Sequence, residues 1–121
     1  MGTKQLGITG GEPLVHPNII DIINYTYKSG ISIYLSTNCD YYPQYSDLIK
    51  DKVAILEIPI DGANPELHDL QRGERSFKAV KYALDDITTS KSITKLKIGT
   101  VITKNNYSDL KNIVLENIRN D

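Results

Sequence analysis

The sequence predicts an α/β fold, specifically a partial (β/α) barrel in which four parallel strands are each followed by a helix. Two observations lead to this prediction. Four short apolar segments alternate along the chain with four segments whose apolar residues recur every three or four positions, which is the pattern of strands alternating with amphipathic helices. In addition, the strand segments are apolar on one side only, whereas a flat sheet with helices on both faces is apolar on both.

The composition limits the class of protein. The 121 residues are enough for a single domain, 1–121, and they carry 14 Lys and Arg against 15 Asp and Glu. Because the cations are not clustered, we expect no nucleic-acid surface. No apolar run approaches the ~20 residues of a membrane span, and no signal peptide is visible at the N-terminus. A single cysteine excludes an intramolecular disulfide, and a cytoplasmic location is the expectation.

The first two strand–helix units fill the N-terminal half. A strand at 5–9 ends in a Gly-Gly-Glu-Pro turn, and a helix follows at about 17–29, because its first residue is a proline, which suits a first helical turn. Gly30 then stands where a left-handed residue ends many helices. The second strand, at 31–38, leads into a short helix at about 43–50.

The last two units follow the same order. A strand at 53–61 leads into a loop that runs through Gly73, and then into the helix Ser76–Thr89, for which the serine is the expected N-cap. The fourth strand, at 96–103, leads into a last helix at about 108–118. Strands that alternate with helices imply parallel pairing and right-handed crossovers.

Alternation along the strands separates an apolar face from a polar one. A barrel wall explains this difference, with helices outside the apolar face and a polar cavity on the concave side. Glu57 and Lys97 lie on this polar face of neighbouring strands, and we expect them within ion-pair or water-bridged range. The alternative is that an open half-barrel leaves both side chains solvated. The residues predicted on the concave side are Ser32, Tyr34, Ser36, Asn38, Val53, Ile55, Glu57, Pro59, Asp61, Lys97, Gly99, Val101, Thr103 and Asn105.

The turn after the first strand carries backbone groups that can bind a ligand. The glycines of Gly10-Gly11-Glu12-Pro13 leave backbone carbonyls and amides uncovered. Carbonyls in such a loop can hold an ammonium group, with Glu12 adding negative charge. A tight turn that needs positive φ is the simpler explanation of a bare glycine pair, and both interpretations stay open at this point.

Four motifs in one order resemble the radical S-adenosylmethionine (SAM) enzymes. One strand–helix unit separates each motif from the next, so the resemblance covers essentially the whole chain. The motifs are ITGGEPL at 8–14, similar to the family's GGEP segment; STN at 36–38, similar to its TNG signature; IDG at 60–62 with HD at 68–69 and RG at 72–73, similar to the S-[ILV]-D-G…HD…RG run of the SPASM-like subgroup, which often modifies peptides; and TVITKN at 100–105, similar to that subgroup's next strand end.

The resemblance implies a SAM site at the carboxyl ends of the strands. Family members cleave SAM reductively with a 4Fe-4S cluster, which gives methionine and a 5′-deoxyadenosyl radical that abstracts hydrogen from a substrate, here a peptide or protein. The cofactor performs that step, and the protein supplies position and shielding. The residues implied to contact SAM are Gly10, Gly11 and Glu12 at its ammonium, Thr37 or Asn38 near its carboxylate or ribose, Asp61 near the ribose hydroxyls, and Val101 or Thr103 near adenine.

Two positions depart from the family pattern. Pro59 stands where the family usually has Ser, which removes a hydroxyl ligand, and a proline inside a paired strand predicts a bulge or an unpaired position. Cys39 stands where the signature usually has Gly, and a small, partly buried residue explains it better than a redox role.

For His68, Asp69 and Arg72 two roles stay open, substrate orientation and loop-stabilising hydrogen bonds.

The cluster ligands of the family are not in this sequence. In the family, three cysteines spaced C-x3-C-x2-C precede the GGEP strand, whereas Cys39 is the single cysteine here, and one thiolate does not hold a cluster normally bound by several. No His, Cys or carboxylate spacing indicates another metal site. We expect a fragment that is inactive by itself, and the edge strands of an incomplete barrel predict a homodimer. The alternative is a non-catalytic half-barrel that binds a nucleotide-like ligand weakly or serves as a protein-interaction module.

Overall fold

The computed structural model describes residues 2–118 and confirms the predicted fold class. Four parallel strands form one sheet in the order β1-β2-β3-β4, with helices between them. Residue 1 and residues 119–121, at the ends of the predicted domain, lie outside the described part. The strands are β1 Gln5–Ile8, β2 Ser32–Ser36, β3 Ile55–Pro59 and β4 Lys95–Gly99; the α-helices are α1 Ile19–Lys28, α2 Tyr42–Lys52, α3 Pro65–Arg72, α4 Ser76–Thr89 and α5 Leu110–Ile118; and the 3-10 helices are η1 Pro13–Val15 and η2 Tyr107–Asp109.

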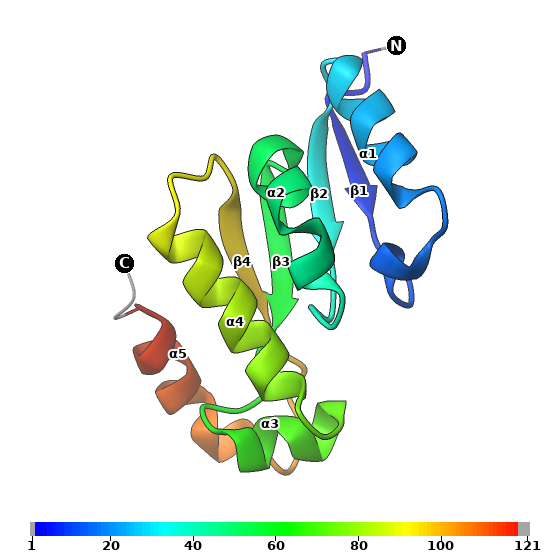
Figure 1. Cartoon of the computed structure of the whole chain (residues 1–121). Helices are drawn as coiled ribbons and strands as arrows, with labels where there is room; N and C mark the ends of the chain where they lie inside the picture. The colour runs from blue at the N-terminus through cyan, green and yellow to red at the C-terminus, as the bar shows by residue number, and fades with distance from the viewer. Residues whose placement is uncertain (1, 119–121) are drawn as a thin grey trace.

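Helices α1, α2 and α4 lie on one face of the sheet and build the core with it (Figure 1). On that face, β2 and β3 present the apolar members of their alternating pattern, which are fully buried. Burying each such side chain contributes about 1.5–3 kcal/mol, so this face fixes which way every strand points its side chains. No helix of the described part is long and apolar enough to cross a membrane. We call the opposite, polar face of the sheet the open face.

Helix α3 occupies a segment for which the sequence indicated a loop. The Asn64 side chain caps its first turn by accepting a hydrogen bond from the Leu67 N–H at 3.0 Å, and Pro65 supplies the first helical residue. Figure 1 places α3 at the carboxyl end of β3, below the arrowheads of the strands. The helix thereby brings its last residue, Arg72, to the end of the sheet where the strands finish.

The predicted N-cap of α4 is wrong. Ser76 is the first helical residue, and the cap residue is Arg75, which has φ 70° and makes no side-chain cap bond. Asp69 of α3 does the capping instead, because its carboxylate accepts hydrogen bonds from the Arg75 and Phe77 N–H groups at 2.9 and 2.8 Å. The cap therefore comes from the preceding helix. By contrast, Gly30 has φ 71° just after α1, which confirms the predicted left-handed position.

Of the two expectations for Pro59, a bulge or an unpaired position, the bulge is absent, since β3 pairs continuously with β4 through Pro59 and Gly99, whereas on the β2 side Pro59 is unpaired. The Thr37 N–H donates to the Glu57 carbonyl on the β2 side at 3.2 Å, and the Ile60 N–H donates to the Gly99 carbonyl on the β4 side at 3.0 Å. Because alternate residues of a strand bond to opposite neighbours, the donor that proline lacks would face β2 beyond its last paired residue. The proline therefore removes no bond from the ladder.

The polar face is confirmed where the strands are regular and fails where they end. Val53 was predicted on the concave side, but it precedes β3 and is fully buried in the core. Val101 and Thr103 lie beyond β4, in a loop, so strand alternation does not orient them. Within the strands the prediction holds: Glu57 and Lys97 are register partners, and Lys97 Nζ lies 2.9 Å from Glu57 Oε2.

Candidate functional site

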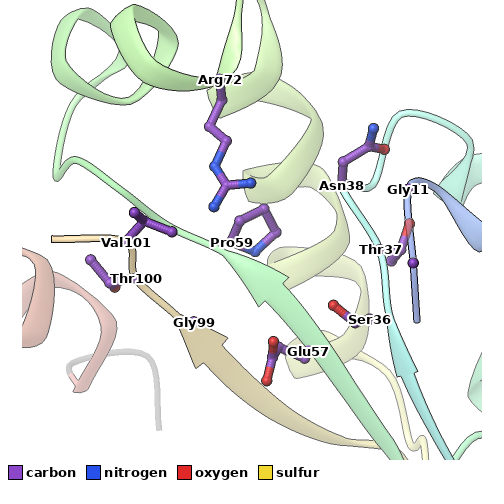
Figure 2. A pocket seen from close by; sticks show the side chains of 11 residues that line it. Gly11, Ser36, Thr37, Asn38, Glu57, Pro59, Arg72, Gly99, Thr100 and Val101 are labelled. Atoms are coloured by element: carbon purple, nitrogen blue, oxygen red, sulfur yellow. The ribbon is translucent and has the colours of Figure 1, made fainter. Parts of the chain in front are cut away.

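A cavity of about 340 Å³ opens at the carboxyl ends of the four strands. Barrel active sites belong at this end. Figure 2 shows its two ends, with Arg72, Asn38 and Val101 around one and Ser36, Glu57 and Gly99 around the other. The lining residues are Gly10, Gly11, Ser36, Thr37, Asn38, Glu57, Pro59, Arg72, Gly99, Thr100 and Val101.

The two glycines after β1 have different reasons to be glycine. Gly10 has φ 128°, a backbone conformation that residues with side chains rarely adopt, so the turn itself requires it. The φ of Gly11 is not positive, and a Cβ added there would meet no atom within 4 Å. Neither backbone strain nor packing explains Gly11. The missing side chain leaves the backbone uncovered at the pocket, where a ligand can approach it closely.

Glu12 joins the first loop to the second. Its Oε1 accepts hydrogen bonds from the Leu14 N–H at 3.0 Å and the Thr37 hydroxyl at 2.7 Å, and its Oε2 accepts one from the Asn38 N–H at 2.7 Å. Glu12 is not among the residues that line the cavity, whereas Thr37 and Asn38 are. Its carboxylate therefore holds the loop after β2 against the glycine turn and brings negative charge close to the pocket.

Cys39 closes the turn after β2 in a left-handed conformation. It has φ 73°, which explains why a glycine suits this position in the family pattern. The side chain is fully buried, and burial raises the pKa of its thiol far above the ordinary value. A buried thiol that stays protonated is unreactive. The structure thus gives Cys39 a packing role.

Asp61 follows β3 and bonds to four residues, two of α3 and two of the segment after β4. Its side chain is 1% exposed; Oδ2 pairs with Arg72 Nε at 2.5 Å, and Oδ1 accepts the Val101 N–H at 2.8 Å. The backbone of Asp61 is held as well, since its N–H donates to His68 Nδ1 at 3.1 Å and its carbonyl accepts from Asn106 Nδ2 at 2.9 Å. Both carboxylate oxygens thus have partners within the protein.

Arg72 is the one cationic side chain among the residues that line the cavity. Figure 2 shows its guanidinium reaching from the end of α3 over Pro59 into the pocket. Since its Nε is bound to Asp61, the direction of the guanidinium is fixed. A guanidinium held in this way presents its terminal nitrogens to a carboxylate or phosphate, which it can bind in bidentate fashion.

A neighbouring cavity of about 330 Å³ is lined by two predicted site residues that the first cavity lacks, Asp61 and Thr103. Gln71, Arg72 and Val101 also line it. The Thr103 hydroxyl donates to the Gln71 side chain, which ties the loop after β4 to α3. Arg72 and Val101 line both cavities, so of the two predicted adenine residues Val101 lies at the border of the cavities and Thr103 lines the second one alone.

His68 and Asp69 stabilise loops. His68 is fully buried and accepts the Asp61 N–H through Nδ1, and burial lowers the pKa of its imidazole. Asp69 caps α4. The hydrogen bonds that its carboxylate accepts lower the pKa of the carboxyl, and the bond from the Phe77 N–H has the largest effect. Of the three residues with two open roles, only Arg72 faces the pocket.

The residues of this chain do not fit a 4Fe-4S cluster. In residues 2–118, no three His, Cys, Asp or Glu side chains gather as metal ligands would. Cys39 is the single cysteine, and it lies in the core. A SAM molecule is different, because its carboxylate, ammonium and hydroxyls need hydrogen-bonding groups and uncovered backbone. The pocket offers these at Arg72, Gly11 and Asn38.

Sequence reasoning identified five of the lining residues, namely Gly10, Gly11, Thr37, Asn38 and Val101. It did not assign Ser36, Glu57, Pro59, Arg72, Gly99 and Thr100 to the SAM site. For Ser36, Glu57, Pro59 and Gly99 the signal was present, since all were placed on the polar side of their strands. Arg72 was singled out in the RG motif with two open roles, but its place at the pocket depends on the helix α3, which the sequence did not predict.

The chain is similar to known proteins over nearly its whole length. The family description "Radical SAM superfamily" matches residues 1–116. The chain is 30% identical over 112 residues to mycofactocin maturase MftC from Mycolicibacterium smegmatis, covering 91% of this chain and 28% of the relative. It is 29% identical to the AdoMet-dependent heme synthase of Methanosarcina barkeri, covering 91% and 32%, and 30% identical to the GTP 3′,8-cyclase of Petrotoga mobilis, covering 94% and 36%.

The fold also has a counterpart among solved structures. The crystal structure of archaeal TYW1 matches with a TM-score of 0.67 at 21% identity, over 97% of this chain and 39% of that one. At this identity the likeness concerns the fold alone. The chain spans roughly a third of the length of the relatives given above.

Proposed function

Because the chain belongs to the radical SAM superfamily, we propose that it is the SAM-binding part of an enzyme that cleaves SAM reductively to a 5′-deoxyadenosyl radical. This radical would abstract a hydrogen atom from the substrate. The observation that carries the proposal is the pocket at the strand ends, where Gly11 leaves backbone uncovered and Arg72 brings a fixed cation. In the proposal a 4Fe-4S cluster, held by residues outside this sequence, supplies the electron.

The residues of this chain would bind and orient SAM. Gly10 and Gly11 would offer backbone groups to the methionine ammonium, and the charge of Glu12 behind them favours a cation there. Arg72 would pair with the methionine carboxylate, beside Asn38. Both carboxylate oxygens of Asp61 accept hydrogen bonds within the protein and its side chain is 1% exposed, so we propose that it acts by holding Arg72 and the Val101 loop. Val101 and Thr103 would lie near adenine.

The substrate we propose is a peptide or protein. The support is the IDG…HD…RG run and the similarity to MftC, whose name is that of a maturase. Among the other relatives, one is named for heme synthesis and one for GTP cyclisation. The superfamily therefore does not fix the substrate, and the proposal depends on the motif run.

We further propose that the 121-residue chain associates with a second copy. Strands β1 and β4 each pair on one side only. Residues Gln5, Leu6 and Gly7 of β1 are exposed, and an uncovered edge strand invites pairing with another chain. Apolar side chains of α5, Val114 and Leu115, are also exposed. Light scattering at micromolar concentration tests this, since a strictly monomeric mass contradicts it.

Titration with SAM tests the proposed function on the full chain. With isotope-labelled protein, we expect the amide signals of Gly11, Asn38 and Val101 to shift saturably, with a dissociation constant on the order of millimolar because much of the ligand surface stays open. Arg72→Ala should weaken binding at least about tenfold, since a hydrogen bond to a charged group contributes about 1.5–3 kcal/mol. Lys78→Ala, an exposed cation on α4, is the matched control.

Absence of SAM binding would contradict the proposal. Saturable binding of adenosine that is as tight as that of SAM would favour the alternative, a half-barrel for a nucleotide-like ligand. If Lys78→Ala and Arg72→Ala lose the same affinity for SAM, the assignment of Arg72 to the SAM site is wrong.

A further inference from the structure

Three side chains on the open face form a cluster that lies outside the family motifs. They come from three neighbouring strands: Tyr34 from β2, Glu57 from β3 and Lys97 from β4. The Tyr34 hydroxyl donates to Glu57 Oε2, and Lys97 Nζ lies 2.9 Å from the same oxygen. Lys97 Nζ also donates to the Tyr34 hydroxyl at 3.2 Å and lies 5.1 Å from the centre of its ring. We call these residues the open-face cluster.

Stability alone does not account for the open-face cluster. The Lys97 side chain is 58% exposed and that of Glu57 is 25% exposed, and ion pairs in such surroundings add little to stability. The interior of a packed barrel is usually filled with branched apolar side chains. This chain places a carboxylate, an ammonium and a phenol there instead, which is the composition of a surface that receives a polar ligand.

Glu57 is the member of the cluster that reaches the pocket. Its Oε2 is held by Tyr34 and Lys97, whereas its Oε1 lies beside Gly99, where an added Cβ would come within 3.3 Å of that oxygen. Ser36, Glu57 and Gly99 together line one end of the cavity (Figure 2). Hydrogen bonds from Tyr34 and then Lys97 lower the pKa of Glu57, so the carboxylate is an anion at neutral pH.

The pocket therefore has opposite charges at its two ends. Arg72 supplies a cation at one end and Glu57 an anion at the other (Figure 2). An anionic acceptor favours a positively charged donor and repels a carboxylate or phosphate. Lys97 already occupies this role in part, and because its side chain is mostly exposed, a ligand can displace it at little cost.

We propose that Glu57 is a substrate-binding residue that takes a positively charged nitrogen group, an ammonium or a guanidinium, at the end of the pocket opposite Arg72. Tyr34 positions the carboxylate, Gly99 leaves its face open, and Lys97 holds the site until the substrate nitrogen replaces it. The inference rests on the proposed function, because SAM at Gly11 and Arg72 leaves the Glu57 end for the substrate.

The test uses the full chain and ethylguanidinium chloride as the probe, with sodium chloride as the reference at equal ionic strength. We expect saturable shifts of the Ser36 and Gly99 amide signals. Glu57→Gln should lower the affinity for the probe at least about tenfold, which is 1.4 kcal/mol. Lys97→Ala should raise this affinity severalfold, because the competing ammonium is gone. Glu74→Gln, an exposed carboxylate on the turn before α4, should leave it unchanged.

Each outcome decides the proposal. Binding that is lost in Glu57→Gln and strengthened in Lys97→Ala supports it. No binding of the probe, equal binding by wild type and Glu57→Gln, or weaker binding by Lys97→Ala overturns it. If Glu57→Gln does not fold, the direction of the Lys97→Ala change decides. A parallel SAM titration separates the two proposals: SAM binding that survives Glu57→Gln but not Arg72→Ala leaves the proposed function standing whatever the probe does.

Discussion

Replacing Asp61 by Asn removes the charge that holds Arg72 and keeps the shape of the side chain. An asparagine can still accept the Val101 N–H, now bound at 2.8 Å, but its amide then faces Arg72 Nε donor to donor. Removing one partner of a fully buried ion pair costs about 3–5 kcal/mol. Because the Arg72 side chain is 33% exposed, water can solvate its released charge, and we expect a loss of about 1–3 kcal/mol.

Urea unfolding followed by circular dichroism at neutral pH measures this loss. The free energy of unfolding should fall by about 1–3 kcal/mol with an unchanged m-value, a sizeable part of the roughly 6–18 kcal/mol expected for a chain of this length. Asp85→Asn, an exposed residue of α4, is the matched control and should stay within about 0.5 kcal/mol of wild type.

A double-mutant cycle with Arg72→Ala completes the test. If Asp61 acts through Arg72, the two substitutions should be non-additive by about 1 kcal/mol or more in unfolding. In SAM binding, Asp61→Asn should weaken affinity about as much as Arg72→Ala, with little further loss in the double variant. An Asp61→Asn variant as stable as wild type, or strictly additive losses, would refute the assignment of Asp61 as the residue that positions Arg72.

Two further predictions concern the turns. The Cys39→Gly variant should be at least as stable as the Cys39→Ala variant in thermal melts, because glycine relieves about 1–2 kcal/mol of left-handed backbone strain that alanine retains. A Cys39→Ala variant that is clearly more stable than Cys39→Gly contradicts this. Asp69 has a lowered pKa, so its carboxylate stabilises the fold above the unfolded-state value of about 3.9 and this contribution is lost as pH falls through the folded pKa. Asp69→Asn should therefore be less stable than wild type near pH 6, and urea unfolding should show the difference shrinking toward pH 3; a constant difference would argue against the cap.

Local patterns determined much of the fold. The period of two in the strand segments and the three-to-four spacing in the helices gave four strand–helix units, and the polar side of the strands correctly placed Glu57 beside Lys97. These features depend on neighbours a few residues apart, so they can be inferred from one sequence. Gly10 and Gly30 were also predictable, because a left-handed turn restricts the residue type directly.

Helix α3 escaped prediction for a local reason. The segment Pro65–Arg72 has a low apolar content and spans only about two turns, so its amphipathic pattern has little length in which to repeat, and the Asn64 cap was not recognised. Ser76 is a residue type that often caps helices, but here the carboxylate of Asp69 accepts the hydrogen bonds from the N–H groups at the start of α4. The boundaries were therefore wrong where a side chain from another element satisfies the backbone.

Only the tertiary structure decided how the site residues are used. The sequence left a ligand role and a structural role open for Glu12 and Arg72, and the family resemblance placed Asp61 near the ribose of SAM. The fold turns Glu12 toward a hydroxyl and an N–H 25 and 26 residues away, and Asp61 toward an N–H 40 residues away. Asp61 also binds Arg72 Nε, so that the guanidinium of Arg72 is held facing the pocket. Residue type sets which partners a charged group can take, whereas the choice between protein and ligand depends on which distant segments the packed sheet brings within hydrogen-bond distance.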